Sequence, residues 1–223
     1  MRKRISSKDF LAMMQAAARL VHEQQARLSQ LDSVSGDGDH GSTMMRVMNS
    51  LEAAFNSDIP IELRKCFCDA GWKVMNSDGG ASSSLLGAFF LGVGEDAQEQ
   101  ASSWDCGEFA GAFEAGLRAL QVQTRAKVGD KTLMDALAPA IEALRTAGNA
   151  GQPVDSALHE AAQAAQAGAK ATESMIAHYG RARLLGEKTL GHQDAGAASV
   201  ALMFQGFSQA MTETKGTVAN ARC

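Results

Sequence analysis

Residues 31–42 read LDSVSGDGDHGS, and this acidic, glycine-rich stretch interrupts a sequence with helical patterning on both sides. Its three glycines fit the pattern G-x-G-x-x-G of dinucleotide-binding loops, but Asp37 and Asp39 stand between them. Such a loop follows a buried strand. The preceding residues, ARLSQLDSV, are amphipathic and helical, and unshielded carboxylates repel a pyrophosphate. The dinucleotide interpretation is therefore disfavoured.

Two further interpretations of this stretch are a calcium loop and a helix-capping turn. An EF-hand loop requires ligands at positions 1, 3 and 5 and a glutamate at position 12, but counting from Asp37 puts Gly41 at position 5 and Met48 at position 12. A capping turn fits better, because aspartate and glycine favour turns and Ser42 is a good N-cap residue. It leaves the clustering of three aspartates within eight positions unexplained.

A divalent metal ion accounts for the acids and the glycines together. Mg²⁺ is commonly held by one or two carboxylates plus substrate phosphates. Asp32, Asp37 and Asp39 would hold the ion, and the ion would neutralise the phosphates. Glycines let backbone N–H groups approach phosphate oxygens, and the start of the next helix adds its positive end. The stretch therefore predicts a metal and phosphate site.

The composition on either side of this stretch predicts an all-α fold. The chain has 40 alanines against 15 valines and isoleucines, and alanine favours helices whereas β-branched residues favour strands. Helical spacing recurs, while period-2 alternation is rare. Eight helices are predicted, over residues 8–31, 43–55, 61–75, 81–93, 106–122, 131–147, 154–178 and 196–211.

Four loops rich in glycine and aspartate precede the second, fourth, sixth and eighth of these helices. They cover residues 31–42, 76–84, 127–135 and 180–199. The connections are mostly short, which favours an antiparallel up-and-down bundle. In such a bundle these four loops lie at the same end, so we expect them to form one site there.

Charge and hydropathy exclude several other classes of protein. The net charge of −4 disfavours a nucleic-acid surface. No segment approaches about 18 consecutive apolar residues, so no membrane span is predicted. The N-terminal sequence MRKRISSKDF lacks the apolar run of a secretory signal. We expect a cytoplasmic protein in which residues 1–223 form a single domain with a core over about 8–212.

The motif at residues 31–41 resembles the pattern L-D-x-x-x-G-D-G/A-D-x-G of the nucleotide-binding L subunit of dihydroxyacetone kinases. Three later loops agree with that family in order and spacing. They are GGAS at residues 79–82, GDKT at residues 129–132 and GRARLLGEKTLGHQDAGAAS at residues 180–199. The resemblance covers almost the whole chain.

The resemblance implies an all-α, barrel-like bundle of eight antiparallel helices that binds ADP or ATP and two Mg²⁺ ions at one end. It implies that Asp32, Asp37 and Asp39 are the metal ligands and the catalytic carboxylates. The nucleotide contacts that it implies are at His40, Gly41, Ser42, Thr43, Ala81, Ser82, Thr124, Leu133, Arg181, Asp194, Ala195 and Gly196. Lys131 and Lys188 are compatible with solvated side chains.

The chain departs from the family pattern at three places. Ser83 and Ser84 stand where the family often has Gly-Pro, and Ala195 replaces the proline of the D-P-G turn. Thr124 occupies a position that is often glycine. These departures leave the predicted metal ligands intact and affect the shape of the adenine pocket.

The resemblance also implies partners. A separate K subunit would hold a small ketose such as dihydroxyacetone. The phosphoryl source stays open between exchangeable ATP and bound ADP that a phosphohistidine M subunit of the phosphotransferase system recharges. Erythrulose is an alternative substrate, and a nucleotide-loaded regulatory partner of a transcription factor is an alternative function. A homodimer is a further open alternative.

Overall fold

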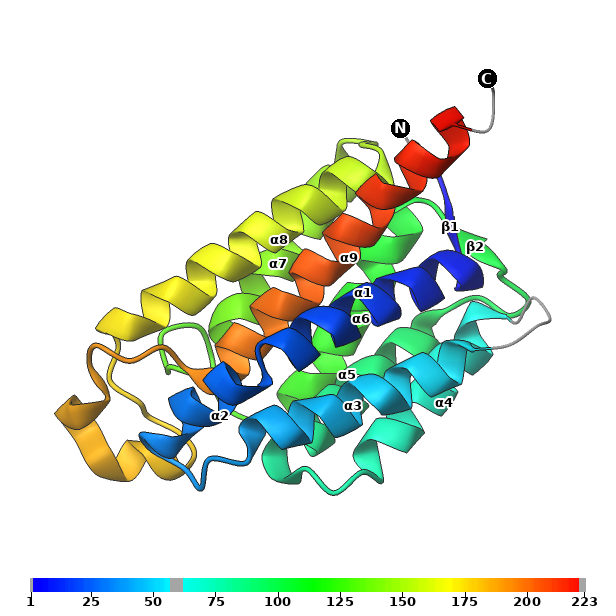
Figure 1. Ribbon diagram of the computed structural model, residues 1–223. Coiled ribbons are helices and arrows are strands. Elements are labelled where there is room, and N and C mark those ends of the chain that lie inside the picture. Colours follow the sequence, from blue (N-terminus) through cyan, green and yellow to red (C-terminus); the bar gives the residue numbers. More distant parts are fainter. Residues whose placement is uncertain (1, 57–61, 221–223) are drawn as a thin grey trace.

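The computed structural model describes residues 2–56 and 62–220, and for residues 213–220 the backbone alone. Its described residues are almost entirely helical (Figure 1), which confirms the predicted all-α class. The α-helices are α1 (Ser7–Glu23), α2 (Gln25–Ser33), α3 (His40–Phe55), α4 (Leu63–Met75), α5 (Gly80–Asp96), α6 (Cys106–Gln123), α7 (Met134–Asn149), α8 (Val154–Ala171) and α9 (Ala195–Asn220). Two 3₁₀ segments, η1 (Thr172–Ser174) and η2 (Arg181–Thr189), and two short strands, β1 (Ile5–Ser6) and β2 (Ser103–Trp104), complete the described elements.

The long helices pack in the order of the sequence. From α3 onward each helix lies against the next one along the chain, and α1 lies against α3. The last helix, α9, lies between α8 and α1, so the order of packing closes on itself (Figure 1). The antiparallel pair of β1 and β2 joins the start of α1 to the segment before α6. This arrangement leaves the loops before α3, α5, α7 and α9 at the other end of the bundle (Figure 1).

A cluster of aromatic rings fills the core near the strand pair. The Phe67 ring stacks on Trp104 with centroids 5.2 Å apart, and Phe10 meets Phe67 edge to face at 4.9 Å. All three side chains are buried. Such pairs add to the free energy gained by burying the ring surfaces. The end of the bundle that carries the strand pair therefore has a well-packed aromatic core, whereas the other end is made of loops.

Small residues allow close contact between helices. A Cβ atom on Gly206 of α9 would lie 2.4 Å from the backbone nitrogen of Ala17 in α1. A Cβ atom on Gly71 of α4 would lie 2.5 Å from the backbone nitrogen of Leu91 in α5. Only glycine fits at these two positions, because the obstructing atoms belong to backbone that cannot rotate away.

The Gly206→Ala substitution is expected to lower the free energy of unfolding by about 1–3 kcal/mol, because α9 must move away from α1. Gly111 of α6 is the matched control, since a Cβ atom there meets no atom within 4 Å. Gly111→Ala should instead raise the free energy of unfolding by about 0.5–1 kcal/mol through helix propensity. Urea unfolding of both variants measures the two effects. Equal changes in both would contradict the packing argument.

The first predicted helix, over residues 8–31, was wrong as a single element. It breaks at Gln24, whose φ and ψ are −102° and 8°, into α1 and α2. Asp32, which the sequence placed in the opening loop, lies in the last turn of α2. The break has a packing reason, because α2 turns to meet the start of α3, where a Cβ on Gly41 would be 2.2 Å from the Gln25 carbonyl oxygen.

Other predicted boundaries also moved. The helix predicted at residues 131–147 begins only at Met134, because Lys131 has a φ of 59° that no α-helix accommodates. The helix predicted at 154–178 ends at Ala171, where the Thr172 hydroxyl bonds to the Ala169 carbonyl oxygen at 2.6 Å and gives way to η1. The second helix begins earlier than predicted, at His40.

The last helix extends beyond its predicted bounds at both ends. The helix predicted at 196–211 extends over Ala195–Asn220, and Met211 is the last core residue described. The predicted start of the third helix at residue 61 lies outside the described residues, and α4 is described from Leu63. In the part of the chain that the structure describes, none of the helices combines the length and the apolarity needed to cross a bilayer.

Candidate nucleotide and metal site

A cavity of about 400 Å³ opens at the loop end of the bundle. Its walls come from residues 31–43, 79–85, 124–134 and 179–196. The predicted convergence of the four loops at one end is therefore confirmed. The volume falls in the range of about 300–1,000 Å³ that is typical of small-molecule sites.

The cavity is bordered by the N-terminal ends of four helices. Lining residues include His40 at the start of α3, Gly80 of α5, Met134 of α7 and Ala195 of α9. A helix N-terminus carries partial positive charge and unpaired backbone N–H groups, which suit phosphate oxygens. The start of α5 has no side-chain cap, so its first N–H groups are available to a ligand. The cavity thus combines four anion-favouring helix ends.

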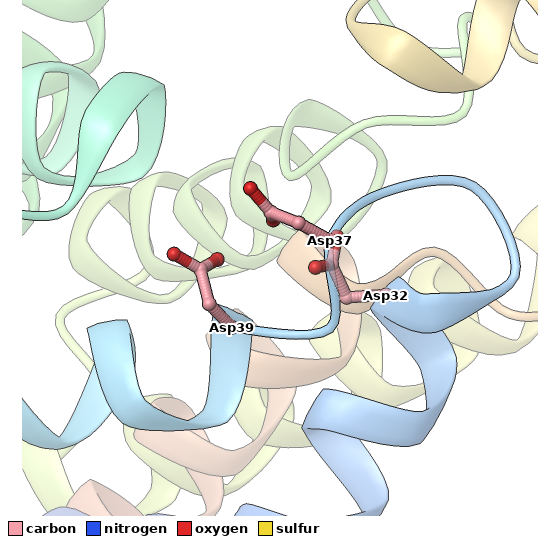
Figure 2. Close-up of side chains that lie close together, drawn as sticks. All are labelled: Asp32, Asp37 and Asp39. Carbon is pink, nitrogen blue, oxygen red and sulfur yellow. The ribbon is translucent and has the colours of Figure 1, made fainter.

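The opening loop carries the acidic cluster of this cavity. Asp32, Asp37 and Asp39 each offer a carboxylate oxygen, and these oxygens lie within 4.8 Å of one another. Figure 2 shows the three side chains gathered around the turn that joins α2 to α3. Asp32 also shapes the turn, because its Oδ2 accepts a hydrogen bond from the Gly38 N–H at 2.8 Å. Gly38 itself has a φ of 75°, which glycine adopts without strain.

The carboxyl groups of Asp37 and Asp39 lie in different electrostatic environments. Asp37 forms an ion pair with Arg181, whose hydrogen bond and charge lower the pKa of the Asp37 carboxyl. Both side chains are well exposed, 52% for Asp37 and 66% for Arg181, so the pair adds little to stability. Burial raises the pKa of Asp39, and the neighbouring charge of Asp37 adds to this effect. The cluster therefore holds like charges together at a cost that a cation would relieve.

The donor set fits a hard divalent cation. Carboxylate oxygens are the ligands that Mg²⁺ and Ca²⁺ prefer, and three of them converge here from one turn. The Asp37 and Asp39 side chains are exposed, and both residues line the cavity. A capping role explains the cluster less well, because Asp39 at the N-cap of α3 makes no side-chain cap hydrogen bond.

The start of α3 is only partly in the cavity. His40 and Thr43 line it, whereas Gly41 and Ser42 are not among the lining residues. Gly41 faces the Gln25 carbonyl, and the Ser42 hydroxyl lies 3.4 Å from the Gln25 amide nitrogen. The glycine at 41 is thus required by the contact of α3 with α2.

His40 ties two helix ends together. It is buried, and its Nε2 lies 3.2 Å from the Ser199 hydroxyl of α9, which donates to the Gly196 carbonyl oxygen at 2.9 Å. Burial lowers the pKa of His40, while a backbone hydrogen bond with Ala195 and the charge of Asp32 oppose this. A buried and largely neutral imidazole suits an orienting role between α3 and α9.

The second loop lies tightly against the first. Ala81 and Ser82 line the cavity from the first turn of α5. A Cβ atom on Gly79 would lie 1.9 Å from the Ser83 hydroxyl oxygen and 2.8 Å from the Thr43 side chain, so any larger residue would force these side chains to move. Arg46 of α3 holds the two loops together, donating to the Asp78 carbonyl oxygen at 2.6 Å and to the Thr43 hydroxyl at 3.0 Å. Nothing in the local sequence around Arg46 indicated this role.

The third and fourth loops, together with Thr124 after the end of α6, form a wall of mixed polarity. Leu133, Thr124, Asp194 and Gly196 line it, together with Ala195. Asp194 caps α9 by accepting the Ala197 N–H at 2.7 Å, and burial raises the pKa of its carboxyl to about 6. Of the predicted site residues, all except Gly41 and Ser42 therefore line one cavity.

Two residues of the third loop were missed by the sequence interpretation. Asp135, which is buried, accepts the N–H groups of Gly129 at 2.6 Å and Thr132 at 2.7 Å and so fixes the turn before α7. Lys131 is also buried, which contradicts its interpretation as a solvated lysine, whereas Lys188 is exposed. An aspartate at the start of a helix is a common cap, so Asp135 gave a weak signal, and Lys131 gave none.

The fold and the site together define a class of protein. Its members are all-α bundles with a cavity that is lined by acidic residues and bordered by helix N-termini. Residues 34–209 match the DAK2 domain. The chain is 36% identical over 190 residues to the "PEP-dependent dihydroxyacetone kinase, ADP-binding subunit DhaL" of Escherichia coli, covering 83% of this chain and 88% of that subunit. The chain therefore belongs to the DAK2 domain family, the family of these DhaL subunits.

Two longer proteins are similar over a part of their length. L-erythrulose 1-kinase of Mycolicibacterium smegmatis is 31% identical over 214 residues, which are 92% of this chain and 36% of that enzyme. The crystal structure of the dihydroxyacetone kinase from C. freundii in complex with AMP-PNP and Mg²⁺ superposes with a TM-score of 0.71 at 25% identity. The match covers 94% of this chain and 35% of that chain.

Proposed function

We propose that this chain is the nucleotide- and magnesium-binding subunit of a kinase that phosphorylates a small ketose such as dihydroxyacetone. The observation that carries the proposal is the convergence of three carboxylates at the mouth of a cavity bordered by four helix N-termini. The similarity to an ADP-binding DhaL subunit and to a kinase crystallised with AMP-PNP and Mg²⁺ supports the same function.

In this proposal the acidic residues hold the metal and the helix starts hold the phosphates. Asp32, Asp37 and Asp39 are the ligands of two magnesium ions. The residues that we assign to the nucleotide are His40, Gly41, Ser42, Thr43, Ala81, Ser82, Thr124, Leu133, Arg181, Asp194, Ala195 and Gly196. The uncapped N–H groups at the start of α5 would donate to phosphate oxygens, and Leu133, which lines the cavity, would lie beside the adenine.

Phosphoryl transfer requires in-line positioning and neutralisation of charge on the transferring group. Magnesium supplies that neutralisation when bound. The chain's own residues bind and orient the nucleotide: the helix starts fix its phosphates, and the apolar wall at Leu133 and Ala195 excludes water around its base. Arg181 pairs with Asp37 across the mouth and is placed to move onto a phosphate, for which its planar fork is suited.

A separate K subunit is the partner that we propose at the mouth of the cavity. Of the described residues, the exposed large apolar side chains are Val34, Trp72, Val122, Val128, Leu184 and Leu190. Each belongs to a loop that builds the cavity or to the last turn of a helix leading into one. Apolar side chains gathered at one end are a feature of protein interaction sites. They support docking of the sugar-bearing subunit there.

The phosphoryl source and the sugar have two candidates each. Bound ADP recharged by a phosphohistidine M subunit is favoured by the similarity to a PEP-dependent DhaL subunit, and exchangeable ATP is favoured by the similarity to the kinase bound to AMP-PNP. The similarity to L-erythrulose 1-kinase makes a tetrulose the second candidate substrate. An assay with a purified K subunit and each donor and sugar in turn decides among them.

Nucleotide binding is expected to depend on Mg²⁺. Without the ion, the negative charges of Asp32, Asp37 and Asp39 repel the phosphates that the helix ends attract. Calorimetry should therefore detect ADP or ATP binding in excess Mg²⁺, with a loss of affinity of at least about tenfold in excess EDTA, corresponding to about 1.4 kcal/mol. Equal affinities in the two buffers would disprove the metal bridge and leave the helix ends as the phosphate site.

A further inference from the structure

Lys131 combines two unfavourable features in one residue. Its φ is 59°, in the left-handed region that costs free energy for any residue with a Cβ atom, and its side chain is only 5% exposed. Burial lowers the pKa of its ammonium group. Gly129, two residues earlier in the same turn, has a φ of 100°. Glycine is sufficient there because that position requires only the backbone conformation and no side chain. A strained non-glycine residue persists when its side chain is needed.

The contacts of the side chain show what it is needed for. The Lys131 Nζ donates to the Thr172 carbonyl oxygen and to the His192 carbonyl oxygen, both at 2.5 Å. Thr172 directly follows α8 and is the first residue of η1, and His192 lies two residues before Asp194, the cap of α9. Hydrogen bonds from an ammonium group are roughly twice as strong as neutral ones. One side chain therefore joins three segments that are far apart in sequence.

The same contacts reach the cavity wall through Thr172. The Thr172 hydroxyl accepts the Asp194 N–H at 2.9 Å, and the Thr172 side chain is fully buried. Asp194 in turn fixes Gly196, where a Cβ atom would lie 3.3 Å from the Leu133 Cβ. The distance between the Leu133 side and the Gly196 side of the cavity is thus set by groups that Lys131 holds.

We propose that Lys131 is a positioning residue of the nucleotide site, whose ammonium group fixes the wall at Asp194 and Gly196 relative to Leu133. The role assigned to the wall rests on the proposed function. The hold of Lys131 on residues 189–197 does not, because it is a property of the ligand-free chain. Lys131 is among the residues that line the cavity, and both hydrogen bonds of its ammonium group go to backbone carbonyl oxygens of the wall. We therefore expect it to act on nucleotide affinity rather than on the transferring group.

The Lys131→Gly variant tests this inference. Glycine adopts the left-handed backbone without strain, so the substitution removes the ammonium group and leaves the turn favourable. The matched control is Gln100→Gly. Within residues 2–56 and 62–220, Gln100 is the other non-glycine residue with a left-handed φ, at 64°, and its side chain is exposed near the strand pair. Gln100→Gly relieves the same kind of strain far from the cavity.

Hydrogen exchange of the ligand-free variants gives the first readout. Amides of residues 189–197 should exchange at least about tenfold faster in Lys131→Gly than in the unsubstituted protein, with protection elsewhere retained. Gln100→Gly should leave these amides unchanged. Equal exchange in all three proteins, or a uniform loss of protection over the whole chain, would overturn the inference.

Nucleotide affinity gives the second readout. The dissociation constant for Mg-ADP should rise about tenfold in Lys131→Gly and stay unchanged in Gln100→Gly. At saturating nucleotide, with the K subunit present, the transfer rate should return to nearly the unsubstituted value. A wild-type dissociation constant, or a rate that stays low at saturation, would overturn the positioning role. If the unsubstituted protein fails to bind Mg-ADP, the proposed function fails, and the exchange comparison alone decides the role of Lys131.

Discussion

The Asp37→Asn variant is expected to fold normally and to lose phosphoryl transfer by about 100-fold or more, the loss typical of removing a group that stabilises transferring charge. The substitution keeps the size and turn preference of the residue and removes one negative charge. Asp37 suits this test better than Asp32, because the Asp32 carboxylate also accepts the Gly38 N–H and braces the turn. The exposed pair of Asp37 with Arg181 contributes little to the fold.

Asp78→Asn is the matched control for this prediction. Asp78 is exposed in the second loop, at the same end of the bundle, and its side chain does not line the cavity. Its substitution removes the same charge and should leave transfer within about twofold, because exposed charges interact weakly through water. Circular dichroism beside a coupled kinase assay with a K subunit makes the measurement. A folded Asp37→Asn protein with near-normal transfer would mean that this carboxylate is not a metal ligand.

The chain on its own is expected to give no measurable phosphorylation of dihydroxyacetone. The predicted site residues that line the cavity are assigned to the nucleotide and the metal in the proposed function, and the sequence offers no separate sugar-binding motif. Adding a K subunit should switch the activity on, since in the proposed function that subunit would supply the sugar at the open mouth. A coupled spectrophotometric assay with and without the K subunit measures the difference. Robust turnover by the isolated chain would refute the division of labour between two subunits.

Leu184→Glu extends this test to the docking surface. Leu184 is 82% exposed on η2, so a charge there should not disturb the core but should weaken an apolar contact with the partner. More K subunit should then be needed for half-maximal activity, with nucleotide affinity unchanged. Gln98→Glu adds the same charge beyond the end of α5, near the strand pair, and should have no effect.

Local signals in the sequence predicted the parts of the fold that depend on local physics. Alanine-rich helical spacing located the helices, and the glycine- and aspartate-rich loops indicated which ends meet, because short connections force neighbouring helices to run antiparallel. The break at Gln24 was not predictable, since no glycine or proline marks it and its cause is the contact of Gly41 with the Gln25 carbonyl. At the end of α8, the hydroxyl of Thr172 donates to the nearby Ala169 carbonyl oxygen and also accepts the N–H of the distant Asp194, a contact that no local pattern indicates.

The residues of the site likewise fall into those that the local sequence predicts and those that it does not. Three aspartates within one turn are visible in the sequence, because neighbours along the chain must be neighbours in space. The ion pair of Arg181 with Asp37 and the bonds from Lys131 to Thr172 and His192 join residues that are far apart, so no local pattern encodes them. The residue type was least informative at Lys131. Lysine is rarely buried unless it has a partner, and the sequence alone does not show the partners of Lys131.

The packing of α9 against α1 bears on how the chain is synthesised in the cell. Ala17 lies on the apolar face of α1 and packs against Gly206 of α9, a helix that is synthesised much later than α1. Translation at about 5–20 residues per second separates the synthesis of these two residues by roughly 10–40 seconds. The contact between α1 and α9, which closes the order of packing, can therefore form only after α9 has been synthesised.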